Sequence, residues 1–174
     1  GMRVHGGELP YRDFWTIYAP GVFYLSAFLQ IFTKQLILEK FITVVIVFFT
    51  AINLNKIYSI FNGKSRYIVF IATIILSGFG LKYLNPAVVA FLFSAISIRY
   101  GLKYFKFGSK SNLLISSLMI GVTAIFRHDF ALYLFVPLIL SIFFDIEKKD
   151  KLKNVLLLFY GILPSHWGNG YAQE

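Results

Sequence analysis

One charged stretch lies directly before a long apolar run and contains residue types that can do acid–base chemistry. In GELPYRDFWTIYAPG, residues 7–21, Arg12 and Asp13 stand side by side among aromatic residues. A carboxylate can take the proton of a hydroxyl group, and a guanidinium can hold a phosphate through its planar set of N–H donors. Asp13 is therefore a candidate general base and Arg12 a candidate substrate ligand. The alternative is a solvated collar of charges at a membrane surface.

A second charged stretch interrupts the apolar sequence further along the chain. AIFRHDFALY, residues 124–133, places Arg127, His128 and Asp129 between two apolar runs. Ionisable residues at the edge of a membrane segment are candidates for a functional site, here one in which Arg127 binds an anion. The polar tip of a helical hairpin explains the same residues equally well. Residues two apart do not face each other on a helix, so Arg127 and Asp129 are not expected to pair on one.

The other polar residues give weaker signals. Lys82 is a candidate substrate ligand, or a side chain that only reaches the membrane surface. Glu8 is expected in plain loop, and a neighbouring ion pair is expected between Glu39 and Lys40. The histidines have no second ligand at metal-binding spacing and cysteine is absent, so the sequence indicates no metal site.

The composition indicates a membrane protein. Of the 174 residues, 57% are hydrophobic and only 14% are charged, against about 25% charged in a typical soluble domain. A water-soluble fold of this size could not bury 20 Phe and 11 Tyr without leaving large exposed apolar patches. The formal charge of +9 comes from residues in the gaps between apolar runs, which argues against a nucleic-acid partner.

The apolar runs predict helices that cross a bilayer. None alternates as a barrel strand does, and helices satisfy the backbone hydrogen bonds in lipid. A crossing needs about 17–25 residues, which flanking polar side chains can lengthen. We expect an all-α, polytopic transmembrane bundle with about six crossings over residues 36–166. The seven runs are residues 14–32, 36–54, 67–81, 86–98, 113–126, 130–144 and 152–163.

Basic residues gather in alternate gaps between the runs, which predicts the orientation of the bundle. Eleven of the 17 basic residues lie in three such gaps, which we expect to be cytoplasmic loops. The gaps that contain Lys82 and Arg127 then face the outer side. The three basic sets are Lys56, Lys64 and Arg66; Arg99, Lys103, Lys106 and Lys110; and Lys148, Lys149, Lys151 and Lys153.

The first apolar run decides which side the opening loop faces. If residues 14–32 cross the membrane, the loop of residues 1–13 lies inside; if they lie in the interface, it lies outside with Arg127. Pro20 and Gly21 interrupt a helix near its start, and the flanking aromatic residues favour the interface. We expect a juxtamembrane or re-entrant helix at 14–32, in a single transmembrane domain over 1–174 that is a fragment of a longer chain.

Both charged stretches resemble parts of the GT-C class of polytopic glycosyltransferases, which includes protein-mannosyltransferase-like and aminoarabinose-transferase-like families. GGELPYRDFWTIYAPGVFYLSAFLQIF is similar to the end of their first outer loop, with its aromatic-Arg-Asp-Phe step and Pro-Gly pair. GVTAIFRHDFALYLF is similar to a later helix-turn-helix with a basic residue at its tip. The family's principal acidic residue usually lies upstream of the point where this sequence begins.

The resemblance implies an enzyme of the cell envelope, in a bacterial-type cytoplasmic membrane. It would move a sugar from a polyprenyl-phosphate carrier to a glycan, lipid or protein acceptor on the outer face. The family uses a carboxylate of the first outer loop to activate the acceptor and basic residues to hold the carrier phosphate. Asp13 matches the Asp of the aromatic-Arg-Asp-Phe step, and Arg127 matches the basic tip. Because the principal acidic residue lies upstream, the resemblance leaves two roles for Asp13, the activating carboxylate or a supporting residue. The resemblance specifies no cofactor and leaves a divalent metal open.

Two other classes of protein remain. A transporter would bind its solute at broken helices near the middle of the membrane, whereas the charges here cluster at the ends of the runs. A non-catalytic multispan protein would not require Asp13 or Arg127.

Overall fold

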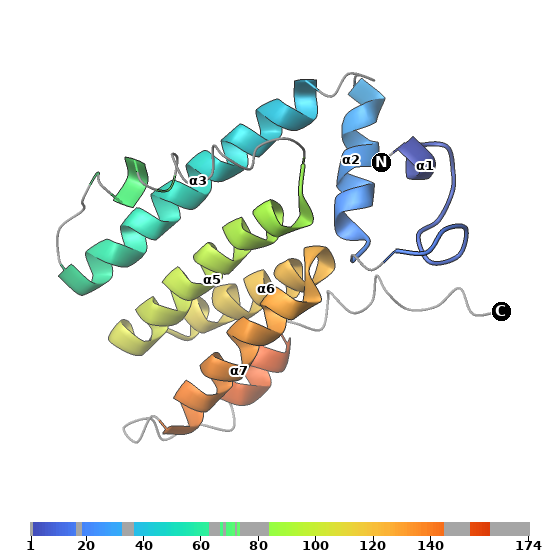
Figure 1. Ribbon diagram of the computed structural model, residues 1–174. Helices are drawn as coiled ribbons and strands as arrows, with labels where there is room; N and C mark the ends of the chain where they lie inside the picture. The colour runs from blue at the N-terminus through green and yellow to red at the C-terminus, as the bar shows by residue number, and fades with distance from the viewer. Residues whose placement is uncertain are drawn as a thin grey trace.

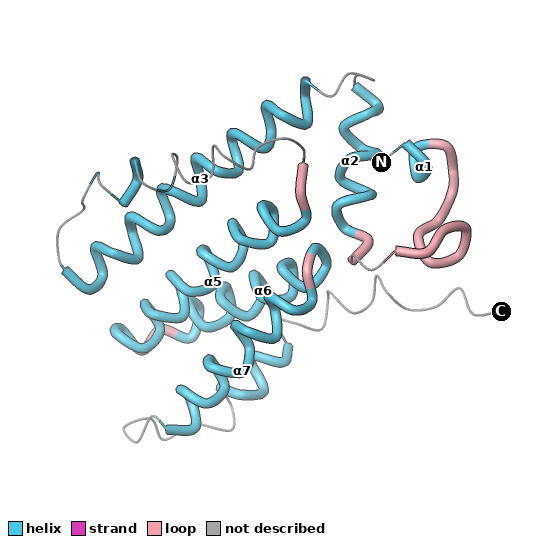
Figure 2. The backbone as a smooth tube through the Cα atoms, in the orientation of Figure 1, coloured by secondary structure: helices cyan, strands magenta, loops and turns pink. Residues whose placement is uncertain are grey.

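The computed structural model describes residues 2–16, 19–32, 37–62, 67, 69–71, 73, 84–144 and 154–160. Every regular element of more than one residue in these ranges is a helix, in agreement with the predicted all-α class (Figure 2). The helices are α1 (Met2–His5), α2 (Gly21–Phe32), α3 (Ile37–Asn62), α5 (Pro86–Phe107), α6 (Lys110–Phe126) and α7 (His128–Phe144), and residues 154–160 are also helical.

The long helix α5 corrects the prediction that the second basic set lies in a loop. Arg99, Lys103 and Lys106 lie in the last turns of α5, which ends only at Gly108 with φ of 72°. Lysine and arginine are good helix formers, and their long side chains can carry the charge beyond an apolar surface. A break in hydrophobicity was therefore not a break in the helix. Lys56 likewise lies inside α3.

Contacts between side chains fix the directions of the main helices. Arg99 Nη1 donates to Asn53 Oδ1 at 3.1 Å, and Lys106 Nζ donates to the carbonyl of Ile60 at 3.1 Å. Each pair is separated by 46 residues, so α3 and α5 run parallel. The C-terminal ends of both helices therefore lie together (Figure 1).

Helices α5 and α6 pack closely and run antiparallel. Ser97 Oγ donates to the carbonyl of Ser116 at 3.0 Å, and Ser116 Oγ donates to the carbonyl of Ser97 at 2.9 Å. Gly101 lies one turn further along α5, where a Cβ atom would stand 3.3 Å from Ser116 Oγ. Gly121 is also buried in α6. Small residues and interhelical hydroxyl bonds are typical of helix pairs in membranes.

Helix α2 lies at a steep angle to α3 and α5, across one end of the bundle (Figure 1). Val22 and Leu29 of α2 share a buried cluster with Ile46, Leu84 and Val89, at the beginnings of the long helices. The resulting structure has α2 as a cover over this end of the bundle, with α1 and the first loop on its far side (Figure 1).

Two described helices, Ile37–Phe61 and Pro86–Phe107, are long and apolar enough to cross a membrane by length and composition. Helices α6 and α7 have 17 residues each, about 25 Å at 1.5 Å per residue. The expected six crossings are thus not shown. The predicted runs 67–81 and 152–163 fall largely outside the described residues.

Candidate functional site

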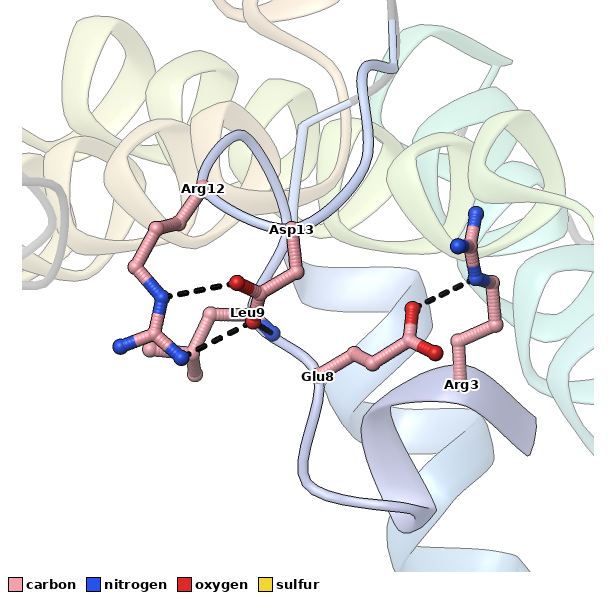
Figure 3. A network of polar contacts seen from close by, with 5 residues as sticks. All are labelled: Arg3, Glu8, Leu9, Arg12 and Asp13. Atoms are coloured by element: carbon pink, nitrogen blue, oxygen red, sulfur yellow. Dashed lines mark hydrogen bonds and ion pairs between the residues drawn. The ribbon is translucent and has the colours of Figure 1, made fainter.

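The first loop is held in shape by the Asp13 carboxylate (Figure 3). Asp13 Oδ2 accepts the backbone N–H of Leu9 at 2.7 Å and Arg12 Nη2 at 2.9 Å. Asp13 Oδ1 accepts Arg12 Nε at 3.0 Å. Tyr11 adopts φ of 68°, which is rare outside glycine, and so makes the turn tight. Arg12 and Asp13 are therefore paired with each other within one loop.

A second ion pair connects this loop to helix α1. Arg3 Nε lies 2.6 Å from Glu8 Oε2. Glu8 lies in a loop, as the sequence predicts, and in addition forms an ion pair. The Arg3 guanidinium also lies 4.8 Å from the centre of the Phe14 ring, and Phe14 packs edge-on against Phe23 of α2 at 5.7 Å. Residues 3–14 thus form a small unit placed against the side of α2.

The Arg12–Asp13 ion pair keeps both of its side chains charged. The hydrogen bond from Arg12, followed by the one from the Leu9 backbone, lowers the pKa of Asp13. Asp13 is therefore ionised at neutral pH but is a weaker base than an ordinary aspartate. The same hydrogen bond raises the pKa of Arg12, which stays charged.

Arg127 occupies the break between α6 and α7. Its backbone is extended, with φ of −153° and ψ of 106°, and its N–H donates to the Thr123 carbonyl at 2.7 Å. Arg127 Nε and Nη2 donate to the two carboxylate oxygens of Asp129 at 3.0 and 2.5 Å. The guanidinium also lies 5.0 Å from the centre of the Phe130 ring.

The Arg127–Asp129 pair was not expected from residues two apart on a helix. It forms because Arg127 is outside both helices, so its side chain can turn back toward the first turn of α7. A carboxylate in that turn is also favoured by the helix dipole. Both side chains are about one-third exposed, at 31% and 34%. His128, the first residue of α7, is exposed, and Lys82 lies outside the described residues.

The two charged stretches lie at the same end of the bundle. The backbone of Gly21 packs so closely on Ile125 that a Cβ atom would lie 2.6 Å from the Ile125 carbonyl oxygen. Ile125 is two residues before Arg127, so the beginning of α2 touches the turn that holds Arg127. The first loop lies beside α2, the helix that begins at this contact (Figure 1).

Glu39 is a third carboxylate at this end, and its partner in the structure differs from the one that the sequence predicts. Glu39, in the first turn of α3, is buried with 9% exposure and accepts a hydrogen bond from the Ser26 hydroxyl of α2. The expected ion pair with Lys40 is wrong, because Lys40 points outward and is exposed. Only the angle of α2 brings Ser26 to Glu39, and nothing in the sequence near Glu39 signals that angle.

Within the described residues, no group of three or more His, Cys, Asp or Glu side chains could hold a metal ion. Comparison with known proteins finds no matching family, no matching curated protein and no matching solved structure.

Proposed function

We propose that this chain is part of a polytopic membrane glycosyltransferase. In this proposal a sugar passes from a polyprenyl-phosphate carrier to an acceptor hydroxyl at the end of the bundle covered by α2. The observation that carries the proposal is the packing of Gly21 on Ile125, because it sets the beginning of α2, eight residues after Asp13, against the end of α6, two residues before Arg127.

Exposed apolar side chains support the membrane placement. On α3 four of the six follow the spacing of one helix face, and on α7 they occur along the whole length of the helix. Outside a bilayer such faces would be large apolar patches in contact with water. The four residues of the α3 face are Ile37, Phe41, Val44 and Phe48, and Phe49 and Phe61 are exposed on other sides of α3. The exposed residues of α7 are Leu132, Tyr133, Val136, Leu140, Phe143 and Phe144.

The proposed chemistry uses one residue from each stretch. The acceptor oxygen bonds to the anomeric carbon of the sugar while the bond from that carbon to the carrier phosphate breaks. Arg127, held in orientation by Asp129, stabilises the negative charge that develops on the leaving phosphate. Asp13 accepts the hydrogen of the acceptor hydroxyl and takes its proton late, because the lowered pKa makes the carboxylate a weak base.

The remaining candidates have supporting roles in the proposal. Arg12 fixes the orientation of Asp13 through two hydrogen bonds. His128 is exposed beside Arg127 and can donate to the carrier phosphate or to the sugar. Lys82 stays a predicted substrate ligand on the same side of the membrane.

A sugar-transfer assay on the complete protein in membranes tests the proposal. Removal of one donor to a developing oxyanion costs about 10²–10³ in rate. We therefore expect Arg127→Gln to lose activity by about that factor and Arg127→Lys to keep part of it, since lysine keeps the charge but not the planar fork. The control Lys40→Gln removes an exposed cation elsewhere and should be fully active. Equal activity of Arg127→Gln and the wild type, at equal expression, would reject the phosphate role.

A non-catalytic multispan membrane protein is the second candidate. It is favoured by the pairing of Asp13 and Arg127 with partners in their own loops, which is what structural ion pairs would look like. That candidate predicts full tolerance of Arg127→Gln in any function of the complete protein, and lower thermal stability as the only effect of Asp13→Asn.

A further inference from the structure

The acidic side chains of the described residues all lie at one end of the bundle, whereas cations lie at both ends. All four described acids, Glu8, Asp13, Glu39 and Asp129, lie in the first loop or in the first turns of α3 and α7. The opposite end, where α3 and α5 finish and α6 begins, contains five cations and no described acid. We call these cations the basic end: Lys56, Arg99, Lys103, Lys106 and Lys110.

The directions of α3, α5 and α6 place the five cations of the basic end at similar positions along the bundle. Because Ile60 of α3 contacts Lys106 of α5, the position of Lys56 falls beside the last turns of α5. The antiparallel Ser97–Ser116 contact places the beginning of α6 beside the same turns. From Arg99 to Lys106 the helix rises only about 10 Å at 1.5 Å per residue.

Neutral groups contact three of the five cations of the basic end, Arg99, Lys103 and Lys106. Arg99 donates to Asn53, an amide, and its buried Nε atom has no hydrogen-bond partner in the described part of the chain. The Lys103 ammonium lies 5.3 Å from the centre of the Tyr100 ring. Lys106 donates to a backbone carbonyl and lies 5.8 Å from the centre of the Phe107 ring. The positive charges of Arg99, Lys103 and Lys106 are thus oriented by contacts with neutral groups.

We infer that the basic end binds the headgroups of anionic phospholipids. The phosphate of such a lipid supplies the negative charge that the described chain lacks there, and aromatic rings such as Phe107, which is exposed, suit the boundary between headgroups and acyl chains. The inference rests on the membrane placement proposed above but not on sugar transfer. Arg99, whose partners in the described chain are the Asn53 amide and the Tyr100 ring, adds a positive charge about two turns before the end of α5.

Thermal unfolding of the purified chain in a neutral detergent tests this inference. Dioleoylphosphatidylglycerol should raise the Tm in a saturable way, whereas dioleoylphosphatidylcholine should not, since a ligand of the folded state stabilises it by mass action. Each lysine near a membrane surface contributes about fivefold to the affinity for anionic lipid. The double variant Lys56→Gln, Lys103→Gln should therefore bind the anionic lipid about 25-fold more weakly.

Controls separate lipid binding from its alternatives. Lys40→Gln removes an exposed cation at the other end and should bind like the wild type, and Lys56→Arg with Lys103→Arg should keep the affinity. An equal Tm increase with the neutral lipid, or an unchanged affinity of the double variant, would overturn the inference. It would also be overturned if inorganic phosphate or polyglutamate reproduced the increase, because the site would then bind anions in general. Because sugar transfer is not measured, failure of the glycosyltransferase proposal would leave this result unchanged.

Discussion

Asp13 shows how a single residue can fit two roles. A general base should have a pKa close to the working pH, but three hydrogen bonds stabilise the ionised form of Asp13. As a loop-forming residue it should be ionised and fully paired, which is the state that its surroundings produce. The chemistry proposed for Asp13 therefore depends on orientation of the acceptor hydroxyl more than on base strength.

The pKa of Asp13 can be measured directly. We expect the carboxyl carbon of Asp13 to titrate, by ¹³C NMR, below the ordinary aspartate pKa of about 3.9, and Arg12→Gln to move it back toward that value, because the Arg12 hydrogen bond is the main cause of the shift. A lowered pKa stabilises the loop at pH values above the ordinary one. This contribution is lost as the pH falls through the lowered pKa. Identical titration in the wild type and in Arg12→Gln would contradict the ion pair.

At the scale of elements, the position of α2 depends on one glycine. Any side chain at Gly21 would overlap the backbone of Ile125, and a backbone atom cannot move aside as a flexible side chain can. We expect Gly21→Ala to displace α2 and to lower the free energy of unfolding by about 1–3 kcal/mol, as overpacking does in other proteins. Gly101→Ala is the matched control, since its Cβ atom would be 3.3 Å from a side-chain oxygen. If both variants unfold at the same temperature, the close approach of α2 to α6 is wrong.

The serine contact between α5 and α6 gives a second prediction at this scale. Ser97 and Ser116 each donate to the other's carbonyl, so the two hydroxyls act as a pair. A double-mutant cycle with Ser97→Ala and Ser116→Ala, followed by thermal or denaturant unfolding in detergent, should give a coupling of about 0.6 kcal/mol, the mean for hydrogen bonds between membrane helices. Zero coupling would mean that small size alone, and not hydrogen bonding, matters at these positions.

The sequence predicted the helices better than their ends or their contacts. Hydrophobic runs identified the apolar parts of α3, α5, α6 and α7, because each run of apolar residues by itself requires burial or contact with lipid. The end of α5 was misplaced by nine residues, at Ile98 in place of Phe107, since lysine and arginine interrupt hydropathy but continue a helix. The bond between Ser26 and Glu39 was missed because it depends on the angle of α2, which only tertiary packing sets.

In the candidate site too, the residues could be predicted from the sequence but their partners could not. The residue types of Arg12, Asp13 and Arg127 were enough to nominate them, because a guanidinium can hold a phosphate and a carboxylate can accept a proton. Their pairing partners needed backbone geometry. Arg127 reaches Asp129 only because its own backbone is extended, and the Leu9 N–H reaches Asp13 only through the turn at Tyr11.

The whole molecule has two ends of different character, and this arrangement makes the strongest test of the membrane proposal. The four described acidic residues and the two charged stretches lie at the end covered by α2, and the basic end lies opposite. If the chain spans a bilayer as proposed, an impermeant thiol reagent should reach the two ends from opposite sides. The chain has no cysteine of its own, so single substitutions report one position each.

We expect Leu9→Cys and His128→Cys to be labelled from the outer side of intact cells, and Lys106→Cys only after the membrane is made permeable. The first two positions must agree because the Gly21–Ile125 contact joins their segments at one end. The third must differ because basic residues are retained on the cytoplasmic side. Lys40→Cys, at the beginning of α3, is the control and should behave like the first two. Labelling of positions 9 and 128 from different sides would separate Asp13 from Arg127 and remove the proposed site. Labelling of all four positions from outside would exclude the membrane-spanning arrangement, although the helix packing and the ion pairs described above could still be correct.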